Sequence, residues 1–126
     1  MSKAIINTPK APAPIGPYSQ AVEANGTVYV SGQVAMDPAT GEVIGGGVEA
    51  QTELVMKHLE SILDAAGLTF AHVVKCSIFV KDMNDFAKVN AIYGKAFPEN
   101  PPARETVEVA RLPKDVLVEI SCIAVA

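Results

Sequence analysis

The sequence predicts an α+β fold in which two helices pack on one face of a β-sheet and leave the other face open. Three observations predict this arrangement. The dipeptide Asn25-Gly26 separates two strand-like runs, two later segments carry apolar residues at helical spacing, and β-branched residues dominate residues 73–80 and the C-terminal end. Because 126 residues suffice for one compact domain, we expect a single domain over residues 1–126.

The N-terminal third is expected to form an extended segment followed by a hairpin. Residues 8–17 hold four of the nine prolines, which disfavours a helix. Strands are expected at residues 18–24 and 27–33, because Asn25-Gly26 tolerates the two positive φ angles of a type I′ turn. A second turn is expected at residues 37–41, leading into three glycines.

Two helices and a strand are expected in the middle of the chain. The first helix should span residues 48–66 and end at Gly67, and residues 73–80 should form a mostly buried strand. The second helix can be capped by Asp82 or Asn84 and cannot continue past Pro98. The apolar stripes of the two helices are Val55, Leu59, Ile62 and Ala66, and Phe86, Val89, Tyr93 and Phe97.

The last two strands, residues 104–110 and 116–125, are expected to form a hairpin around residues 112–115. In the last strand one row of side chains is apolar and suits the helices: Val116, Val118, Ile120 and Cys122. The opposite row contains Glu119 and Ser121 among apolar residues, so the open face of the sheet is half apolar. Such a face is typical of a subunit interface.

Composition limits the classes of partner. Hydrophobic residues make up 49% of the chain and charged residues only 19%, so we expect apolar surface to remain for an oligomeric partner. The net charge of -4 and the lack of a basic run argue against nucleic acid, and no apolar stretch is long enough to span a membrane. Without a secretory signal the chain is expected in the cytoplasm, where Cys76 and Cys122 would be buried thiols and not a disulfide or metal site.

Arg104 is a candidate binding residue. If Val107 faces the helices, Arg104 lies on the open face with Thr106 and Glu108, where a neighbouring subunit is expected. A planar guanidinium in a half-buried place holds a carboxylate by two parallel hydrogen bonds. An intersubunit salt bridge is the equally weighted alternative.

Glu119 interrupts an apolar strand, and a buried carboxylate without a partner would be costly. It can instead orient a water that attacks an electrophilic carbon. If Arg111 pairs with Val116 in the hairpin, Glu108 lies opposite Glu119, and Arg104 is about 13 Å away at strand rise. The gap could hold a small anion and a water, or the site could be completed across a subunit boundary.

Other positions carry weaker signals. Glycines 45–47 lack the residues of a phosphate loop, and His58 and His72 have no second ligand at metal spacing, so all are expected to be structural and no metal is predicted. Asn90 lies off the helical stripe, a pattern that favours a solvated side chain. Ser31-Gly32 interrupts a hydrophobic strand and could leave backbone close to a ligand.

Several motifs together resemble the RidA (YjgF-type) family of imine and enamine deaminases, over nearly the whole chain. They are Ile15-Gly16-Pro17-Tyr18-Ser19-Gln20-Ala21, Val30-Ser31-Gly32-Gln33, Val80-Lys81-Asp82-Met83-Asn84-Asp85-Phe86, Val89-Asn90-Ala91-Ile92-Tyr93, and the run from Pro102 to Asp115 with its Arg104 and Arg111-Leu112-Pro113-Lys114-Asp115. The resemblance implies a chorismate-mutase-like mixed sheet with two helices on one face, assembled as a homotrimer with ligand clefts between subunits.

The same resemblance implies hydrolysis of 2-imino acids such as 2-iminobutanoate and 2-iminopropanoate to 2-oxo acids and ammonia, without a cofactor, which protects pyridoxal-phosphate enzymes. Arg104 would bind the substrate carboxylate and Glu119 would position the water. The implied cleft residues are Tyr18, Ser31 and Asn90, with backbone contacts from Gly32 and Thr106.

Thr106 stands where members of the best-known branch of the family often carry Cys. Because the resemblance implies that this residue contacts the ligand mainly through its backbone, Thr106 argues against a role for a thiol and not against the activity. Two alternatives remain open: a protein that senses small carboxylates such as 2-oxo acids without turnover, and a relative that acts on another enamine such as aminoacrylate.

Overall fold

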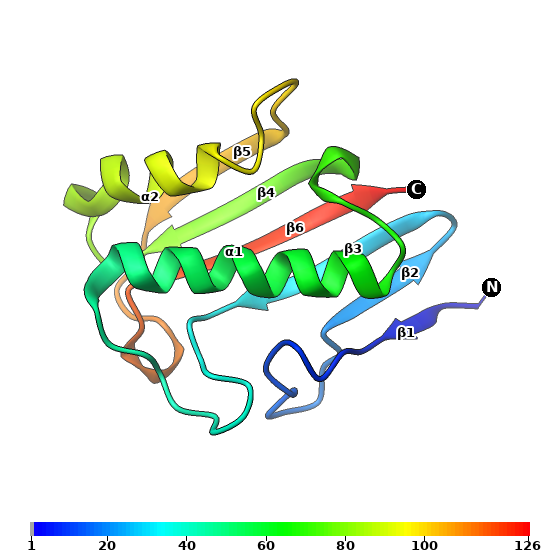
Figure 1. The fold of residues 1–126 in the computed structure, drawn as a ribbon, viewed down its shortest axis with the longest axis horizontal. Helices are drawn as coiled ribbons and strands as arrows, with labels where there is room; N and C mark the ends of the chain where they lie inside the picture. The colour runs from blue at the N-terminus through cyan, green and yellow to red at the C-terminus, as the bar shows by residue number, and fades with distance from the viewer. Residues whose placement is uncertain (1) are drawn as a thin grey trace.

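The computed structural model describes residues 2–126 and contains one mixed six-stranded sheet with both helices on the same face (Figure 1). The predicted α+β architecture is therefore confirmed; Met1, the remaining residue of the predicted domain, lies outside the described residues. The strands are β1 (Ala4–Ile6), β2 (Ala21–Ala24), β3 (Thr27–Gln33), β4 (Val73–Val80), β5 (Ala103–Glu108) and β6 (Val118–Val125). The α-helices are α1 (Gly47–Ala65) and α2 (Phe86–Gly94), and the short 3-10 helices are η1 (Phe70–His72), η2 (Met83–Asp85) and η3 (Pro113–Asp115).

Local sequence signals account for most of these elements. Asn25 and Gly26 both have positive φ, 52° and 78°, and join β2 to β3 as a hairpin, as predicted. Strand β4 has the predicted bounds, and α1 begins and ends one residue before the predicted helix. Asp82, one of the two predicted caps, accepts a hydrogen bond from the Asn84 amide at the start of η2, which leads into α2.

The core lies between the helices and the sheet. The apolar row predicted for the last strand is buried: Val118, Ile120 and Cys122 lie in β6, and Val116 lies two residues before it. Helix α1 packs against β3 and β6. His58 is buried in α1 and binds the Met36 carbonyl through Nε2 at 2.8 Å, and burial lowers its pKa. Cys76 and Cys122 are free, buried and opposite each other on β4 and β6. The two cysteines are buried thiols, as expected, and His58 packs within the core.

The predicted hairpin between the last two strands is wrong. The strand order is β1-β2-β3-β6-β4-β5, so β4 separates β5 from β6. Strand β5 runs parallel to β4, because the chain between them crosses over the sheet through α2 and reaches the far edge. Strand β6 then returns between β3 and β4 and is antiparallel to both. Turn-like residues before β6 thus join two strands that are not neighbours.

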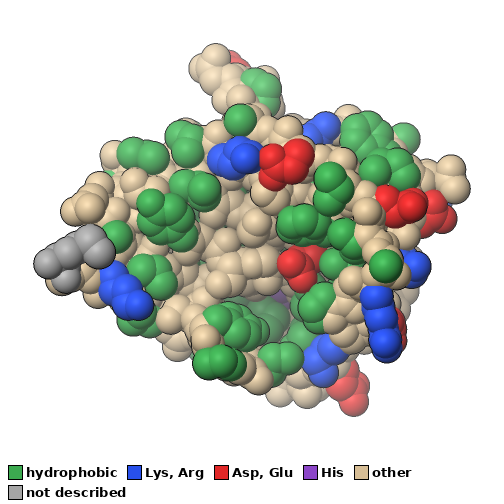
Figure 2. Space-filling view, turned by 180° about the vertical axis from the view of Figure 1, so that it is seen from behind, with side chains coloured by type: hydrophobic (Ala, Val, Ile, Leu, Met, Phe, Trp, Pro, Cys, Tyr) green, Lys and Arg blue, Asp and Glu red, His purple; other side chains and the backbone are tan. Residues whose placement is uncertain are grey.

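The face of the sheet opposite the helices is open, as predicted. It carries exposed apolar side chains such as Tyr29 and Val107 together with polar groups, among them Glu105, which binds Lys75 at 3.0 Å and accepts a hydrogen bond from Ser77. Figure 2 shows this face, which is hollowed near its centre beside an acidic side chain. Within residues 2–126, no helix combines the length and apolar character needed to cross a bilayer.

Candidate functional site

The residues predicted to form one site fall into two clusters. Tyr18, Ser31, Gly32 and Glu119 line a cavity of about 370 Å³ at the end of β3. Arg104 and Asn90 line a second, more open cavity of about 430 Å³ between α2 and β5. The two clusters lie on different faces of the sheet.

Glu119 provides the carboxylate of the first cavity. Its neighbours on β6, Val118 and Ile120, are buried under the helices, so the strand alternation directs Glu119 to the open face. The side chain is half-buried and makes no hydrogen bond to any part of residues 2–126, and burial raises its pKa. A carboxylate in this setting is available to a ligand or a water and is more basic than an exposed glutamate.

A β-bulge brings the β3 backbone against Glu119. Val30 pairs with Cys122 and Gln33 with Ile120, so Ser31 and Gly32 together stand opposite a single residue of β6. A Cβ on Gly32 would lie 2.8 Å from Glu119 Cδ, closer than atoms can approach. The glycine predicted from its place in a strand therefore makes room for the carboxylate.

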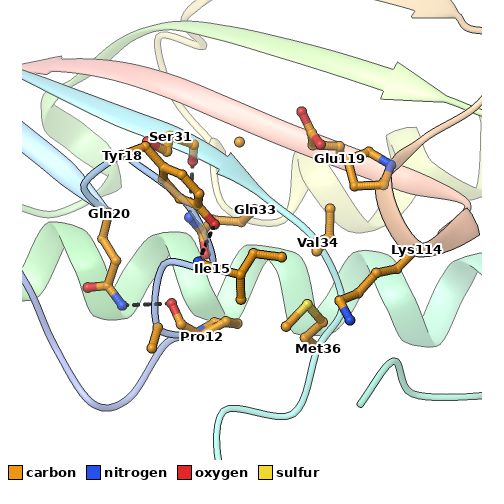
Figure 3. A pocket seen from close by; sticks show the side chains of 13 residues that line it. Pro12, Ile15, Tyr18, Gln20, Ser31, Gln33, Val34, Met36, Lys114 and Glu119 are labelled. Carbon is orange, nitrogen blue, oxygen red and sulfur yellow. Dashed lines mark hydrogen bonds between the residues drawn. The ribbon is translucent and has the colours of Figure 1, made fainter. Parts of the chain in front are cut away.

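Tyr18 and Ser31 form the side of the cavity next to the N-terminal segment (Figure 3). The exposed Tyr18 hydroxyl accepts a hydrogen bond from the Ile15 amide at 3.3 Å. The Ser31 hydroxyl donates to the Ser19 carbonyl at 2.6 Å, which ties the bulge to the segment before β2. The remaining lining residues, which sequence reasoning did not single out as a site, are Pro12, Ala13, Ile15, Gln20, Gln33, Val34, Met36, Pro113 and Lys114.

Arg104 lies on the helix side of the sheet, so the prediction that it lies on the open face is wrong, although Thr106 and Glu108 share its face as predicted. In the parallel pairing Arg104 is opposite Cys76, which is buried under the helices. Val107, expected to face the helices, is opposite Phe79 and 40% exposed. The error has a physical cause: β5 is an edge strand that the helices cover only in part, so its apolar residues do not mark the buried face.

The second cavity is organised around the Arg104 guanidinium. Nη1 donates to the Asn90 Oδ1 atom at 2.7 Å, and the guanidinium carbon lies 5.1 Å and 5.5 Å from the ring centres of Tyr93 and Phe86. Asn90, which helical periodicity suggested to be solvated, thus orients the arginine. The remaining donors of the guanidinium can bind a carboxylate.

Thr106 and Glu108 continue this row along β5. Thr106 is opposite Ile78, and its hydroxyl is buried without a hydrogen-bond partner within residues 2–126. Glu108 is opposite Val80 and accepts a hydrogen bond from the Met83 amide, so it is not opposite Glu119 as the hairpin register predicted. Glu119 pairs with Phe79 on β4.

One copy of the chain does not bring Arg104 and Glu119 together. Their strands β5 and β6 are two steps apart in the sheet, about 10 Å at the usual strand spacing, and the side chains leave opposite faces. Of the two arrangements left open by the sequence, a gap within one chain is therefore disfavoured. Residues 2–126 also contain no group of three or more His, Cys, Asp or Glu side chains placed to hold a metal ion.

The structure combines an α+β fold with two cavities of small-molecule size on opposite faces of a mixed sheet. Comparison with known proteins identifies the family. A family model described as Endoribonuclease L-PSP matches residues 8–126. A RutC family protein of Synechocystis is 56% identical over 127 residues, which cover 99% of this chain and 98% of that protein.

Two further matches agree. The mouse protein named 2-iminobutanoate/2-iminopropanoate deaminase is 50% identical over 121 residues, which cover 96% of this chain and 90% of that protein. The crystal structure of E. coli TdcF with bound serine matches with a TM-score of 0.91 at 41% identity and covers 98% of both chains. The chain belongs to this family, the Rid (YjgF-type) proteins.

Replacement of Gly32 tests the contact between the bulge and Glu119. We expect Gly32→Ala to lower the free energy of unfolding by about 1 kcal/mol, because the Glu119 side chain has to turn away from the added Cβ. Gly94→Ala is the matched control, since a Cβ there meets nothing within 4 Å. Denaturant unfolding measures both, and the Glu119→Ala background should remove most of the Gly32→Ala cost. A cost of equal size in that background would show that the strain lies elsewhere.

Proposed function

We propose that the chain hydrolyses 2-imino acids and their 2-enamino tautomers, including 2-iminobutanoate and 2-iminopropanoate, to 2-oxo acids and ammonia. In this proposal the protein is a homotrimer in which Arg104 of one subunit and Glu119 of its neighbour face the same cleft. The name of the mouse relative supports this substrate class, and the serine in the E. coli TdcF structure is a molecule of similar size and charge. Removal of such imines would protect pyridoxal-phosphate enzymes from damage.

One observation carries the proposal. The Arg104 guanidinium, which can bind a carboxylate, and the unpaired Glu119 carboxylate lie on opposite faces of one sheet. Each lines a cavity with only part of the required chemistry. The Arg104 cavity can hold the substrate carboxylate, and the Glu119 cavity can hold the reacting carbon and a water. The open face beside Glu119 is half apolar, which suits contact with a second copy.

The reaction needs orientation more than strong activation. A 2-imino acid protonated on nitrogen is electrophilic at C2, and bidentate binding of its carboxylate would fix the position of that carbon. Glu119 would accept a proton from the water as its oxygen bonds to C2. Glu119 would then return that proton to the carbinolamine nitrogen, the C2–N bond would break as ammonia leaves, and the hydroxyl proton would pass back to the Glu119 carboxylate as the C2=O bond of the 2-oxo acid forms. The proposed steps require no metal, cofactor or protein nucleophile.

The remaining cleft residues have supporting roles in the proposal. Asn90 orients the Arg104 guanidinium, with the 2.7 Å hydrogen bond between them as its support. Gly32 and Thr106 would contribute backbone contacts, and Tyr18 and Ser31 would bound the space beside Glu119. Thr106 stands where relatives often carry Cys. Because the proposed steps use no thiol, the Thr106 hydroxyl does not have to replace a catalytic group.

Two other activities are distinguished by one assay. A sensor of small carboxylates would use Arg104 in the same way but would not release ammonia, and a relative specific for aminoacrylate would act on that enamine alone. The family description names a ribonuclease. A net charge of -4 and the absence of a basic run in the sequence do not favour binding to an RNA backbone.

The Arg104 proposal is tested in an assay in which threonine dehydratase generates 2-iminobutanoate in place and ammonia release is followed. We expect Arg104→Ala to lower kcat/KM by about a hundredfold, because a charged, bidentate hydrogen-bond pair is lost. Arg111→Ala is the matched control: Arg111 forms an exposed ion pair with Asp115, so its removal should leave turnover unchanged. Full activity of Arg104→Ala would contradict the proposal, and so would binding of 2-oxobutanoate without turnover by the unmodified protein.

The Glu119 proposal predicts a specific pH dependence. The ionised carboxylate is the active form, so kcat/KM should fall as pH drops through the pKa of Glu119. Because burial raises that pKa, the acid limb should lie above the value of about 4.3 for an exposed glutamate. Glu119→Gln should retain part of the activity, since the amide still binds water, and should lose this limb. An unchanged pH profile in Glu119→Gln would remove Glu119 from the mechanism.

A further inference from the structure

The N-terminal segment of residues 8–17 forms one wall of the Glu119 cavity. Pro12, Ala13 and Ile15 line the cavity from this segment. In Figure 3 Pro12, Ile15 and Met36 lie on the side of the cavity away from Glu119, and Val34 lies between them and Glu119. A ligand whose reacting carbon is next to Glu119 therefore turns its opposite end toward this wall.

The segment has few hydrogen bonds of its own to hold it in place. It lies outside the strands β1 and β2, and its prolines have no amide hydrogen to donate. Its other hydrogen bonds are local: the Lys10 amide binds the Thr8 hydroxyl at 3.2 Å, the Ile15 amide binds the Tyr18 hydroxyl at 3.3 Å, and the Tyr18 amide binds the Gly16 carbonyl at 2.8 Å. None of these local hydrogen bonds fixes the distance between the segment and the sheet.

Gln20 makes the contacts that do fix this distance. Its side chain is 2% exposed and comes from the residue just before β2. Oε1 accepts a hydrogen bond from the Thr8 amide at 2.7 Å, and Nε2 donates to the carbonyls of Thr8 at 3.0 Å, Pro12 at 2.9 Å and Ala11 at 3.3 Å. The buried amide thus has partners for both its acceptor and its donors, and all of them belong to the backbone of residues 8–12.

We propose that Gln20 is a positioning residue: it holds residues 8–12 in place and with them the apolar wall of Pro12, Ala13 and Ile15 opposite Glu119, and it thereby sets which imino-acid side chains the site accepts. The inference rests on the proposed function, since it concerns the selectivity of the same cavity. Gln20 acts through the wall and not on the reacting atoms. Its loss should therefore change discrimination between substrates more than it changes the chemistry common to them.

The test compares Gln20→Met with Gln51→Met. Methionine keeps the approximate size of the side chain and removes its hydrogen bonds. Gln51 is a matched control because it is also buried and bridges two backbone segments, binding the Ile44 carbonyl and the Leu117 amide, but it does not line the cavity. Both variants should be destabilised, so loss of stability alone does not distinguish them.

The decisive measurement is a ratio of kcat/KM values. An amino-acid oxidase with catalase generates 2-iminopropanoate from alanine and 2-imino-4-methylpentanoate from leucine, and ammonia release is followed for each. We expect the ratio between the two substrates to shift by about tenfold toward unity in Gln20→Met, the scale of discrimination that apolar pockets achieve, and to stay unchanged in Gln51→Met. Hydrogen exchange at the Thr8 amide should accelerate only in Gln20→Met.

The outcomes separate the two proposals. No turnover of either imine by the unmodified protein would contradict the proposed function. Normal turnover with an unchanged ratio in Gln20→Met, or an unchanged Thr8 exchange rate, would overturn the role of Gln20 alone. If Gln20→Met does not fold, Pro12→Gly loosens the same wall while it retains the Pro12 carbonyl that Gln20 binds. An unchanged ratio in Pro12→Gly would then overturn the inference.

Discussion

The alternation of side chains between the two faces of the sheet is the constraint on which the rest of the structure depends. Strand β6 buries every second residue under the helices, and this fixes Glu119 on the open face. Strand β5 pairs in parallel with β4, and this fixes Arg104 on the helix face, opposite Cys76. A shift of β6 by one residue would move Glu119 to the helix face, but it would also expose the core row of that strand. A shift of β5 by one residue would move Arg104 to the open face, but it would also break the register that pairs β5 with β4.

The same constraint explains why each half of the proposed site is held by its own local contacts. On the open face a β-bulge and a glycine make room for the carboxylate, and a proline-rich segment held by Gln20 closes the far side. On the helix face an amide from α2 and two aromatic rings orient the guanidinium. The contacts that hold each half lie within one chain, so neither half depends on the other for its geometry.

Local patterns in the sequence predicted most elements but not how they pair. Asn25-Gly26, the helical stripe of α1 and the alternation in β4 and β6 depend on neighbours in the chain, and all four are present, with β6 beginning at Val118 and not at residue 116. The hairpin between the last strands failed because strand order depends on where α2 crosses the sheet, which no turn motif encodes. The face of Arg104 failed with it, since Val107 on an edge strand is exposed although it is apolar. Asn90 came from family resemblance alone, because its partner is distant in the sequence.

The central claim is that a working site takes Arg104 from one subunit and Glu119 from another. Co-expression of Arg104→Ala and Glu119→Ala chains with different tags, followed by purification on both tags, gives mixed assemblies. In a cyclic trimer each mixed assembly then contains one site with both residues intact, so we expect about one third of the activity of the unmodified protein on 2-iminobutanoate, although each parent alone is nearly inactive. Mixed assemblies no more active than the two parents would contradict the account, because they would place both residues in a site made by one chain.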